Sequence, residues 1–350
     1  MPYRSRTALL PLMLASMLLV SASHRAFAQS VEQFYRGKTI DLIVPFTTGG
    51  LNDLAGRLLA RWMPRYIPGQ PTIVVQNEPS AGGLALANRF GHSVPTDGTL
   101  IAAMGRALPQ FQIMGDPNAH FDPAAFNWLG SVSSFQNDAS LLVLNASAKA
   151  KTVADLKRSG PPVPIGANRI GSTNMTLALI AKDVLGLNVQ IVQGFPGTND
   201  ISLAMQRHEV DGQVVDLSYI LSAQRSAWES KQLRPIIQFA RTTRLPQLPD
   251  VPTAQELAQN DKDRALIAFA ELPFFMAAPF AAPPGVPSDR AQALQSAFMQ
   301  AVHDPSFLAD AKTAGIEVSP IDGNAVSRLI ADANKTPRDV IARFKTLVGE

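Results

Sequence analysis

Residues 39–90 read TIDLIVPFTTGGLNDLAGRLLARWMPRYIPGQPTIVVQNEPSAGGLALANRF, and they alternate short apolar runs with helical patterns. The run from Thr39 to Phe46 is apolar with several β-branched residues, which predicts a buried strand. A helical pattern from about Asp53 to Trp62 follows it. A second strand, Pro71 to Gln76, and a second helix, Leu84 to Phe90, repeat the order. Such alternation favours a parallel sheet with helices on both faces.

The same alternation extends over the rest of the chain, with a second set of elements after Trp128. Further strands are expected at Thr99 to Met104, Ser140 to Leu144, Pro164 to Gly166, Val189 to Val192, Gln213 to Asp216, Leu233 to Phe239 and Phe274 to Phe280. Helices are expected after Thr152 as N-cap, at Thr173 to Leu185, Thr198 to Arg207, Pro287 to His303 and from Ala325 onward. The pattern predicts an α/β fold without internal repeats.

Three of the strand–helix junctions share one design. They read TTGGLND at residues 47–53, EPSAGG at residues 78–83 and ANRIGST at residues 167–173. Glycines let the backbone approach a ligand, and a helix N-terminus adds unpaired N–H donors with a partial positive charge. A small anion such as a carboxylate fits this design without a basic side chain. In a parallel sheet, these junctions lie together at the carboxyl ends of the strands.

Several polar residues of these junctions have two interpretations. Asp53 is interpreted first as a residue that caps its helix and second as a ligand contact. Ser172 and Thr173 also fit a capping role. Arg169 and Arg106 fit either exposed surface arginines or partners of a ligand carboxylate.

The first 28 residues predict an export signal. Arg4 and Arg6 precede an apolar run from Ala8 to Val20, and the small-residue sequence AFA follows at residues 26–28. This order is typical of a secretory signal peptide, with cleavage before Gln29. The apolar run is short for a permanent membrane anchor, which is the less favoured alternative. We therefore expect a periplasmic protein.

Composition narrows the function classes further. The chain has 31 Lys and Arg and 28 Asp and Glu, and the three basic residues of this excess lie in the signal segment. The balance elsewhere gives no reason to expect nucleic acid as a partner. There is no cysteine, and the histidines have no metal-ligand spacing. Hydrolase and nucleotide-binding motifs are absent, so we expect no enzyme activity, no metal and no cofactor.

Five segments carry a family resemblance. They are residues 34–83, PTDGTLIAAM at 95–104, VQGFPGTNDISLAMQRHEVDGQ at 192–213, LPDVPTAQEL at 248–257 and APPGVPSDRAQALQSAFMQAVHDPSF at 282–307. Together they resemble the periplasmic solute-binding proteins of the tripartite tricarboxylate transporter (Bug/TctC) family. The resemblance implies a type II periplasmic-binding fold of the Venus flytrap kind, in which each of two lobes is a mainly parallel sheet flanked by helices. It implies residues 29–141 plus 241–350 as one lobe and 142–240 as the other.

The resemblance also implies a binding site between the lobes. In the first lobe the implied residues are Phe46, Thr47, Thr48, Gly49, Gly50, Leu51, Asn52, Asp53, Ser80, Ala81, Gly82 and Gly83. In the second lobe they are Gly171, Ser172, Thr173, Pro196, Gly197, Thr198, Asp216 and Ser218. The chain departs from the usual family pattern at Thr48, Leu51, Glu78 and Arg169, and Glu78 is expected to face away from an anion.

The function implied is capture of a small organic carboxylate for a membrane permease of a tripartite transporter. The binding protein is expected to act as a monomer. Two alternatives stay open, a binding component that serves a membrane sensor and, from another class, a periplasmic hydrolase.

Overall fold

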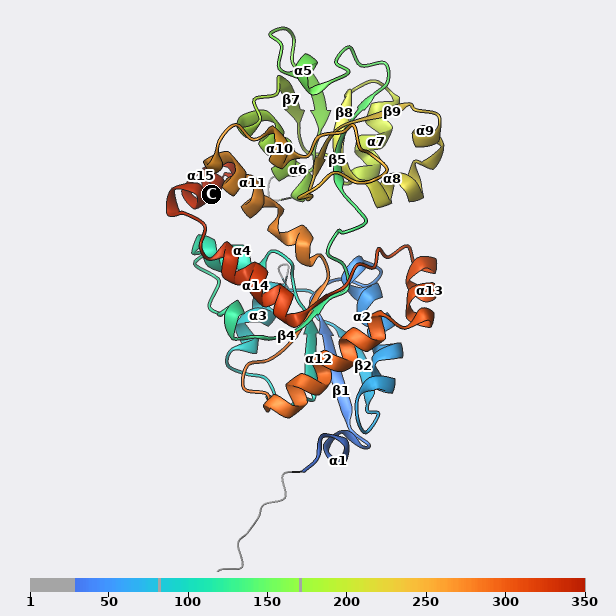
Figure 1. Cartoon of the computed structure of the whole chain (residues 1–350), viewed down its shortest axis with the longest axis vertical. Helices are drawn as coiled ribbons and strands as arrows, with labels where there is room; N and C mark the ends of the chain where they lie inside the picture. Colours follow the sequence, from blue (N-terminus) through green and yellow to red (C-terminus); the bar gives the residue numbers. More distant parts are fainter. Residues whose placement is uncertain (1–28, 81–82, 170–171, 350) are drawn as a thin grey trace, which may run out of the picture.

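The computed structural model describes residues 29–80, 83–169 and 172–349, and over these residues the chain forms two lobes, each built on one sheet (Figure 1). The first lobe has a six-stranded sheet in the order β11-β4-β10-β3-β1-β2, and the second a five-stranded sheet in the order β7-β6-β8-β5-β9. The predicted signal segment, residues 1–28, lies outside the described residues. No described helix has the length and apolar composition needed to span a bilayer.

The strands of the first lobe are β1 Thr39–Val44, β2 Thr72–Asn77, β3 Leu100–Ala103, β4 Asn127–Ser131, β10 Pro279–Ala282 and β11 Ile321–Asp322. Its helices are α1 Val31–Tyr35, α2 Leu51–Trp62, α3 Leu84–Phe90, α4 Leu108–Met114, α12 Ser288–Val302, α13 Pro305–Thr313 and α14 Gly323–Ala333. The strands of the second lobe are β5 Ser140–Asn145, β6 Val163–Gly166, β7 Val189–Val192, β8 Gly212–Asp216 and β9 Leu233–Phe239. The helices that belong to or pack on it are α5 Val153–Leu156, α6 Thr173–Leu179, α7 Thr198–Gln206, α8 Leu217–Ala223, α9 Arg225–Glu229, α10 Ala254–Leu257, α11 Asp261–Glu271 and α15 Arg338–Val348.

Both sheets are mixed in the same way. In the first lobe β1 is parallel to β2 and β3, whereas β10 is antiparallel to β3 and β4. In the second lobe β6 is parallel to β7 and β8, whereas β5 is antiparallel to β8 and β9. In each case the reversed strand is the first one the chain forms after it crosses from the other lobe. The remaining long strands share one direction, so their carboxyl ends meet at one edge of each sheet.

Two segments connect the lobes, and they pair with each other. Residues 132–139 lead from β4 to β5, and residues 272–278 lead back from α11 to β10. The Val132 amide bonds to the Ala278 carbonyl at 3.0 Å, and the Ala277 amide bonds to the Ser133 carbonyl at 2.9 Å. The return segment is a 3₁₀ helix, Leu272–Met276, so the strand expected at Phe274 to Phe280 is wrong except for its end. Pro273 lies in the first turn of this helix, a position where proline's fixed φ suits helical geometry.

The lobe boundaries stay a prediction, but the packing of two late helices, α11 and α15, bears on where the second lobe's core lies. Leu266, Ile267 and Phe269 of α11 share one apolar core with Phe344 of α15 and with β5 and β9 of the second lobe. The rings of Phe269 and Phe344 meet edge to face, with centroids 5.1 Å apart. Residues late in the chain thus complete the core of the second lobe.

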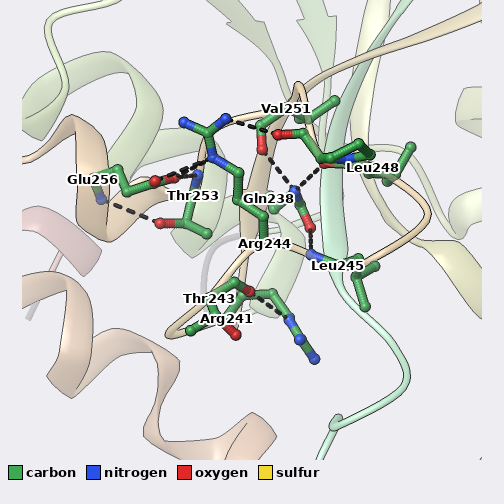
Figure 2. Close-up of polar contacts among 10 residues, drawn as sticks. Gln238, Arg241, Thr243, Arg244, Leu245, Leu248, Val251, Thr253 and Glu256 are labelled. Carbon is green, nitrogen blue, oxygen red and sulfur yellow. Dashed lines mark hydrogen bonds and ion pairs between the residues drawn. The ribbon is translucent and has the colours of Figure 1, made fainter.

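The proline-rich loop after β9 is held by one buried amide (Figure 2). Gln238 of β9 is fully buried, and its Oε1 accepts a hydrogen bond from the Leu245 amide at 2.9 Å. Its Nε2 donates to the carbonyls of Leu248 at 3.0 Å and Val251 at 2.6 Å. Thr253 then caps α10 in a reciprocal pair with Glu256. These bonds satisfy the backbone of a loop that has no regular structure of its own.

Candidate ligand-binding cleft

A cavity of about 510 Å³ lies between the lobes at the carboxyl ends of the strands. Phe46 after β1 and Arg106 after β3 line it from the first lobe, and Asp216 at the end of β8 lines it from the second. Its apolar wall includes Phe111, Phe135 and Ala277. A smaller pocket of about 200 Å³ adjoins it on the second lobe, and Asp216 lines both. Concave, partly apolar sites with a few convergent polar groups are typical of small-molecule binding.

Arg106 is the basic residue that the structure brings into this cavity. Its Nη2 donates to Oγ1 of Thr173 in the second lobe at 3.2 Å, so its side chain spans the cleft. Its guanidinium lies over the ring of Phe274, 4.7 Å from the ring centroid. Burial lowers the pKa of Arg106, and the negative charge of Asp216 opposes that effect. The group remains a cation, and among the described residues Thr173 is the one hydrogen-bond partner of its guanidinium.

Acidic side chains face the same cavity. Burial raises the pKa of Asp216 to about 6, with the nearby charge of Asp138 acting in the same direction and Ser140 and Arg106 against it. Asp138 is only 2% exposed, and burial raises its pKa although the amides of Ala139 and Ser218 donate to its carboxylate. Asp216 is therefore still mostly ionised at pH 7 and above.

The start of α2 also faces the cavity, because Leu51 and Asn52, its first two residues, line it. This helix is twelve residues long, and its first amides have no partners within the helix. The oxygen of the Asn52 side chain is buried and has no hydrogen-bond partner among the described residues. A buried polar atom of this kind is normally paired with water or a ligand.

The loop before α2 is held by Asp53, which is 2% exposed. Its carboxylate accepts hydrogen bonds from the Gly49 amide at 2.8 Å, from Nδ2 of Asn77 at 2.8 Å and from Nε of Arg57 at 3.1 Å. Burial alone would raise the pKa of Asp53, but these hydrogen bonds outweigh it and hold the pKa below its usual range. Asp53 thus fixes the loop that carries Leu51 and Asn52 to the cleft.

We expect Asp53→Asn to destabilise the fold by about 2 kcal/mol, because the variant loses charge-assisted bonds to three donors. Ligand affinity should fall with it, since the start of α2 loses its support. Urea unfolding and calorimetric titration measure the two effects. Asp183→Asn, at an exposed site of the second lobe, is the matched control. Wild-type stability and affinity in Asp53→Asn would remove this supporting role.

The comparison with known proteins identifies the family. The sequence model of one protein family, the tripartite tricarboxylate transporter family receptor, matches residues 57–345 of the chain. The chain belongs to this receptor family. Its members are solute-binding receptors, and membership implies a periplasmic location.

Relatives of this tripartite tricarboxylate transporter receptor support the same fold along nearly the whole chain. A UPF0065 protein of Bordetella pertussis is 25% identical over 324 residues, which cover 91% of this chain and 92% of the relative. A TctC solute-binding protein from Polaromonas, solved without ligand, superimposes with a TM-score of 0.67 at 18% identity, covering 90% of this chain and 99% of its own. A Rhodopseudomonas palustris protein solved with adipate gives a TM-score of 0.57 at 20% identity, covering 89% and 97%. The receptor therefore has the two-lobed type II fold of periplasmic binding proteins.

The structure of the receptor brings part of the predicted site together. The 510 Å³ cavity is lined by the predicted residues Phe46, Leu51, Asn52, Arg106, Asp216 and Ser218. The adjoining pocket is lined by Ser172, Thr173, Thr198 and again Asp216. Three predicted residues, Ala81, Gly82 and Gly171, lie outside the described residues. The role of all these residues in ligand binding stays a prediction.

Other predicted residues of the receptor do not line either hollow. They are Thr47, Thr48, Gly49, Gly50, Asp53, Ser80, Gly83, Arg169, Pro196 and Gly197. Several loop amides that were expected to face the ligand bond within the loops instead, because the Gly49 amide bonds to Asp53 and the Gly83 amide bonds to the Ser80 carbonyl at 2.6 Å. The Arg169 side chain is exposed, and Glu78 pairs with Arg89 at 2.8 Å outside the cleft.

Several residues that line the receptor's cavity were not predicted from the sequence, among them Phe111, Ser133, Phe135, Asp138 and Glu317. Asp138 lies in the first crossing segment, two residues before an expected strand, which is the one signal that could have found it. No motif marks Glu317, which reaches the cavity from the loop after α13.

A larger hollow of about 720 Å³ lies beside the crossing segments, lined by Gln136, Arg241 and α14 residues such as Arg328. None of the predicted site residues lines it. In the described parts of the receptor, no three His, Asp or Glu side chains converge in an arrangement suited to a metal ion. We take the 510 Å³ cavity as the candidate site because it lies at the carboxyl ends of the strands and is lined by predicted residues from both lobes.

Proposed function

We propose that the protein is an exported receptor that captures a small organic carboxylate in the interlobe cleft and delivers it to the membrane permease of a tripartite transporter. The observation that carries this proposal is Arg106, a half-buried guanidinium that spans the cleft from the first lobe to Thr173 of the second. A guanidinium in a desolvated cleft is the side chain best suited to bind a carboxylate.

The start of α2 is the second support for a carboxylate ligand. The amides of its first turn have no partner within the helix, and the partial positive charge of this helix end lies on the first-lobe side of the cavity, as Arg106 does. Adipate, the compound in the R. palustris structure of the same fold, is also a small carboxylate. The ligand's carboxylate would bind first to the first lobe, which provides Arg106 and the start of α2 as hydrogen-bond donors.

Closure of the lobes is the proposed signal to the permease. A ligand that contacts both lobes binds the closed state better and shifts the population toward it. Micromolar affinity requires about 8 kcal/mol, which a few charge-assisted hydrogen bonds in a closed cleft can supply. Export would depend on the signal segment, with cleavage before Gln29, and the receptor would act as a monomer.

A thermal-shift screen of the chain from Gln29 onward tests this function. We expect at least one organic acid to raise Tm, because a ligand at 100 times its Kd adds about 2.7 kcal/mol to the stability of the native state. The uncharged methyl esters of the same acids are the control and should leave Tm unchanged. If no organic acid shifts the Tm of the folded protein, or if the protein turns an acid over, the proposed function is wrong.

A further inference from the structure

The described side chains that line the cleft include more acidic than basic groups. Its wall carries the guanidinium of Arg106 and the carboxylates of Asp138, Asp216 and Glu317. Among the described lining residues, Arg106 is the one with a positive charge. A ligand with two or three carboxylates would bring more negative charge to a wall that is already negative.

Asp216 is the acid that lines both hollows of the cleft. It lines both the larger cavity and the adjoining pocket, so its carboxylate lies on the surface that joins them. One of its oxygens accepts a hydrogen bond from the Ser140 hydroxyl. Arg106 acts on it electrostatically from the opposite lobe. Arg106 of the first lobe and Asp216 of the second thus carry opposite charges on facing walls of the cleft.

The other two acids are already engaged by the protein. Asp138 accepts hydrogen bonds from the amides of Ala139 at 2.8 Å and Ser218 at 3.1 Å. Glu317 accepts from the hydroxyls of Ser133 and Ser319. These bonds hold both carboxylates in place at the cavity wall.

We propose that the ligand of this cleft is zwitterionic, with a single carboxylate held by Arg106 and the start of α2 and a cationic amine that faces Asp216. The inference rests on the proposed function, since it names the class of carboxylate that the same cleft accepts. The carboxylate end of the ligand matches Arg106 of the first lobe, and the amine end matches Asp216 of the second. Closure then brings each end to its partner, which makes binding depend on both lobes.

Calorimetric titrations at pH 7.5 with matched compounds test the proposal. The probes are ω-amino acids from glycine to 6-aminohexanoate, the dicarboxylates in which a carboxylate replaces the ammonium group, and the corresponding monocarboxylates. We expect the best ω-amino acid to bind at least tenfold more tightly than its matched dicarboxylate. Dicarboxylates that bind more tightly than every ω-amino acid would overturn the zwitterion proposal and leave the proposed function standing. If no compound of the three classes binds but another organic acid raises Tm in the screen, the zwitterion proposal fails and the proposed function stands.

Two substitutions make the test specific for the acidic wall. Asp216→Asn should cost at least tenfold in affinity for the ω-amino acid and should not weaken the matched dicarboxylate. Glu317→Gln, in the first lobe, should shift the same preference in the same direction by a smaller factor. Asp183→Asn, exposed and distant from the cavity, is the control and should change neither. Equal losses for both ligand classes in folded Asp216→Asn and Glu317→Gln would also overturn the proposal.

Discussion

Replacing Arg106 by glutamine is expected to weaken ligand binding about 100-fold, which corresponds to about 3 kcal/mol. The variant loses the charge-assisted hydrogen bonds to the carboxylate and the contact with Thr173 across the cleft. It also removes the positive charge that acts on Asp216, so a carboxylate would enter a cavity whose described lining residues include acids and no base. Calorimetric titration of the tightest ligand from the screen measures the loss.

Two further variants separate charge from geometry at this position. Arg106→Lys keeps a positive charge but loses the planar group that lies over Phe274, so it should recover only part of the affinity. Arg338→Gln removes an exposed arginine at the start of α15 and should bind as the wild type does. Wild-type affinity in a folded Arg106→Gln variant would exclude this residue from the binding site.

The strand–helix junctions of the first lobe could be predicted because residues close together in the sequence mark each of them. The apolar run that ends at Phe46 and the glycines at 49 and 50 define where β1 ends and α2 begins. Local patterns also located Arg106 just past β3. The position of these residues at a cleft follows from strand direction, which the alternation of strands and helices predicts.

The hydrogen-bond partners of the polar side chains could not be predicted in the same way. Asp53 and Gly49 are close in sequence, but Asn77, the third partner of this cluster, comes from the neighbouring strand β2. Glu317 reaches the cavity from the loop after α13, and its partner Ser133 is 184 residues earlier in the chain. Contacts of this range depend on packing and leave no periodic signal in the sequence.

The crossing segment after α11 shows a second reason why part of the fold could not be predicted from the sequence. Residues 272–278 read LPFFMAA, an apolar run that fits a strand as well as a buried helical turn. Pro273 has no N–H for an α-helical bond, and the chain after α11 goes on as a 3₁₀ helix with this proline in its first turn. Phe274 packs against Phe135 with ring centroids 5.0 Å apart. The packing partner decides the conformation here, and it lies in the other crossing segment.

A buried acid, Glu271, makes the stability of the fold depend on pH. It is the last residue of α11, is fully buried and accepts a hydrogen bond from the Ala240 amide at 2.9 Å, where the chain leaves β9. Burial raises its pKa from 4.5 to about 8, against the smaller opposing effects of the Ala240 amide and Gln255. The native state therefore keeps this proton between these two pH values, whereas the unfolded chain releases it. Stability from this group is full below pH 4.5 and is lost as the pH rises to about 8.

Glu271→Gln should remove this loss, because the amide keeps the acceptor for Ala240 and cannot ionise. Relative to wild type, the free energy of unfolding of the variant should increase with pH by roughly 4 kcal/mol between pH 4.5 and 8, at about 1.4 kcal/mol per unit. Urea unfolding at closely spaced pH values measures the difference, and taking the difference cancels the other titrating groups. Glu229→Gln, at an exposed position on α9, should give a flat difference across the same range. A flat difference for Glu271→Gln as well would mean that the native protein holds Glu271 ionised, with a partner for its charge at the end of α11.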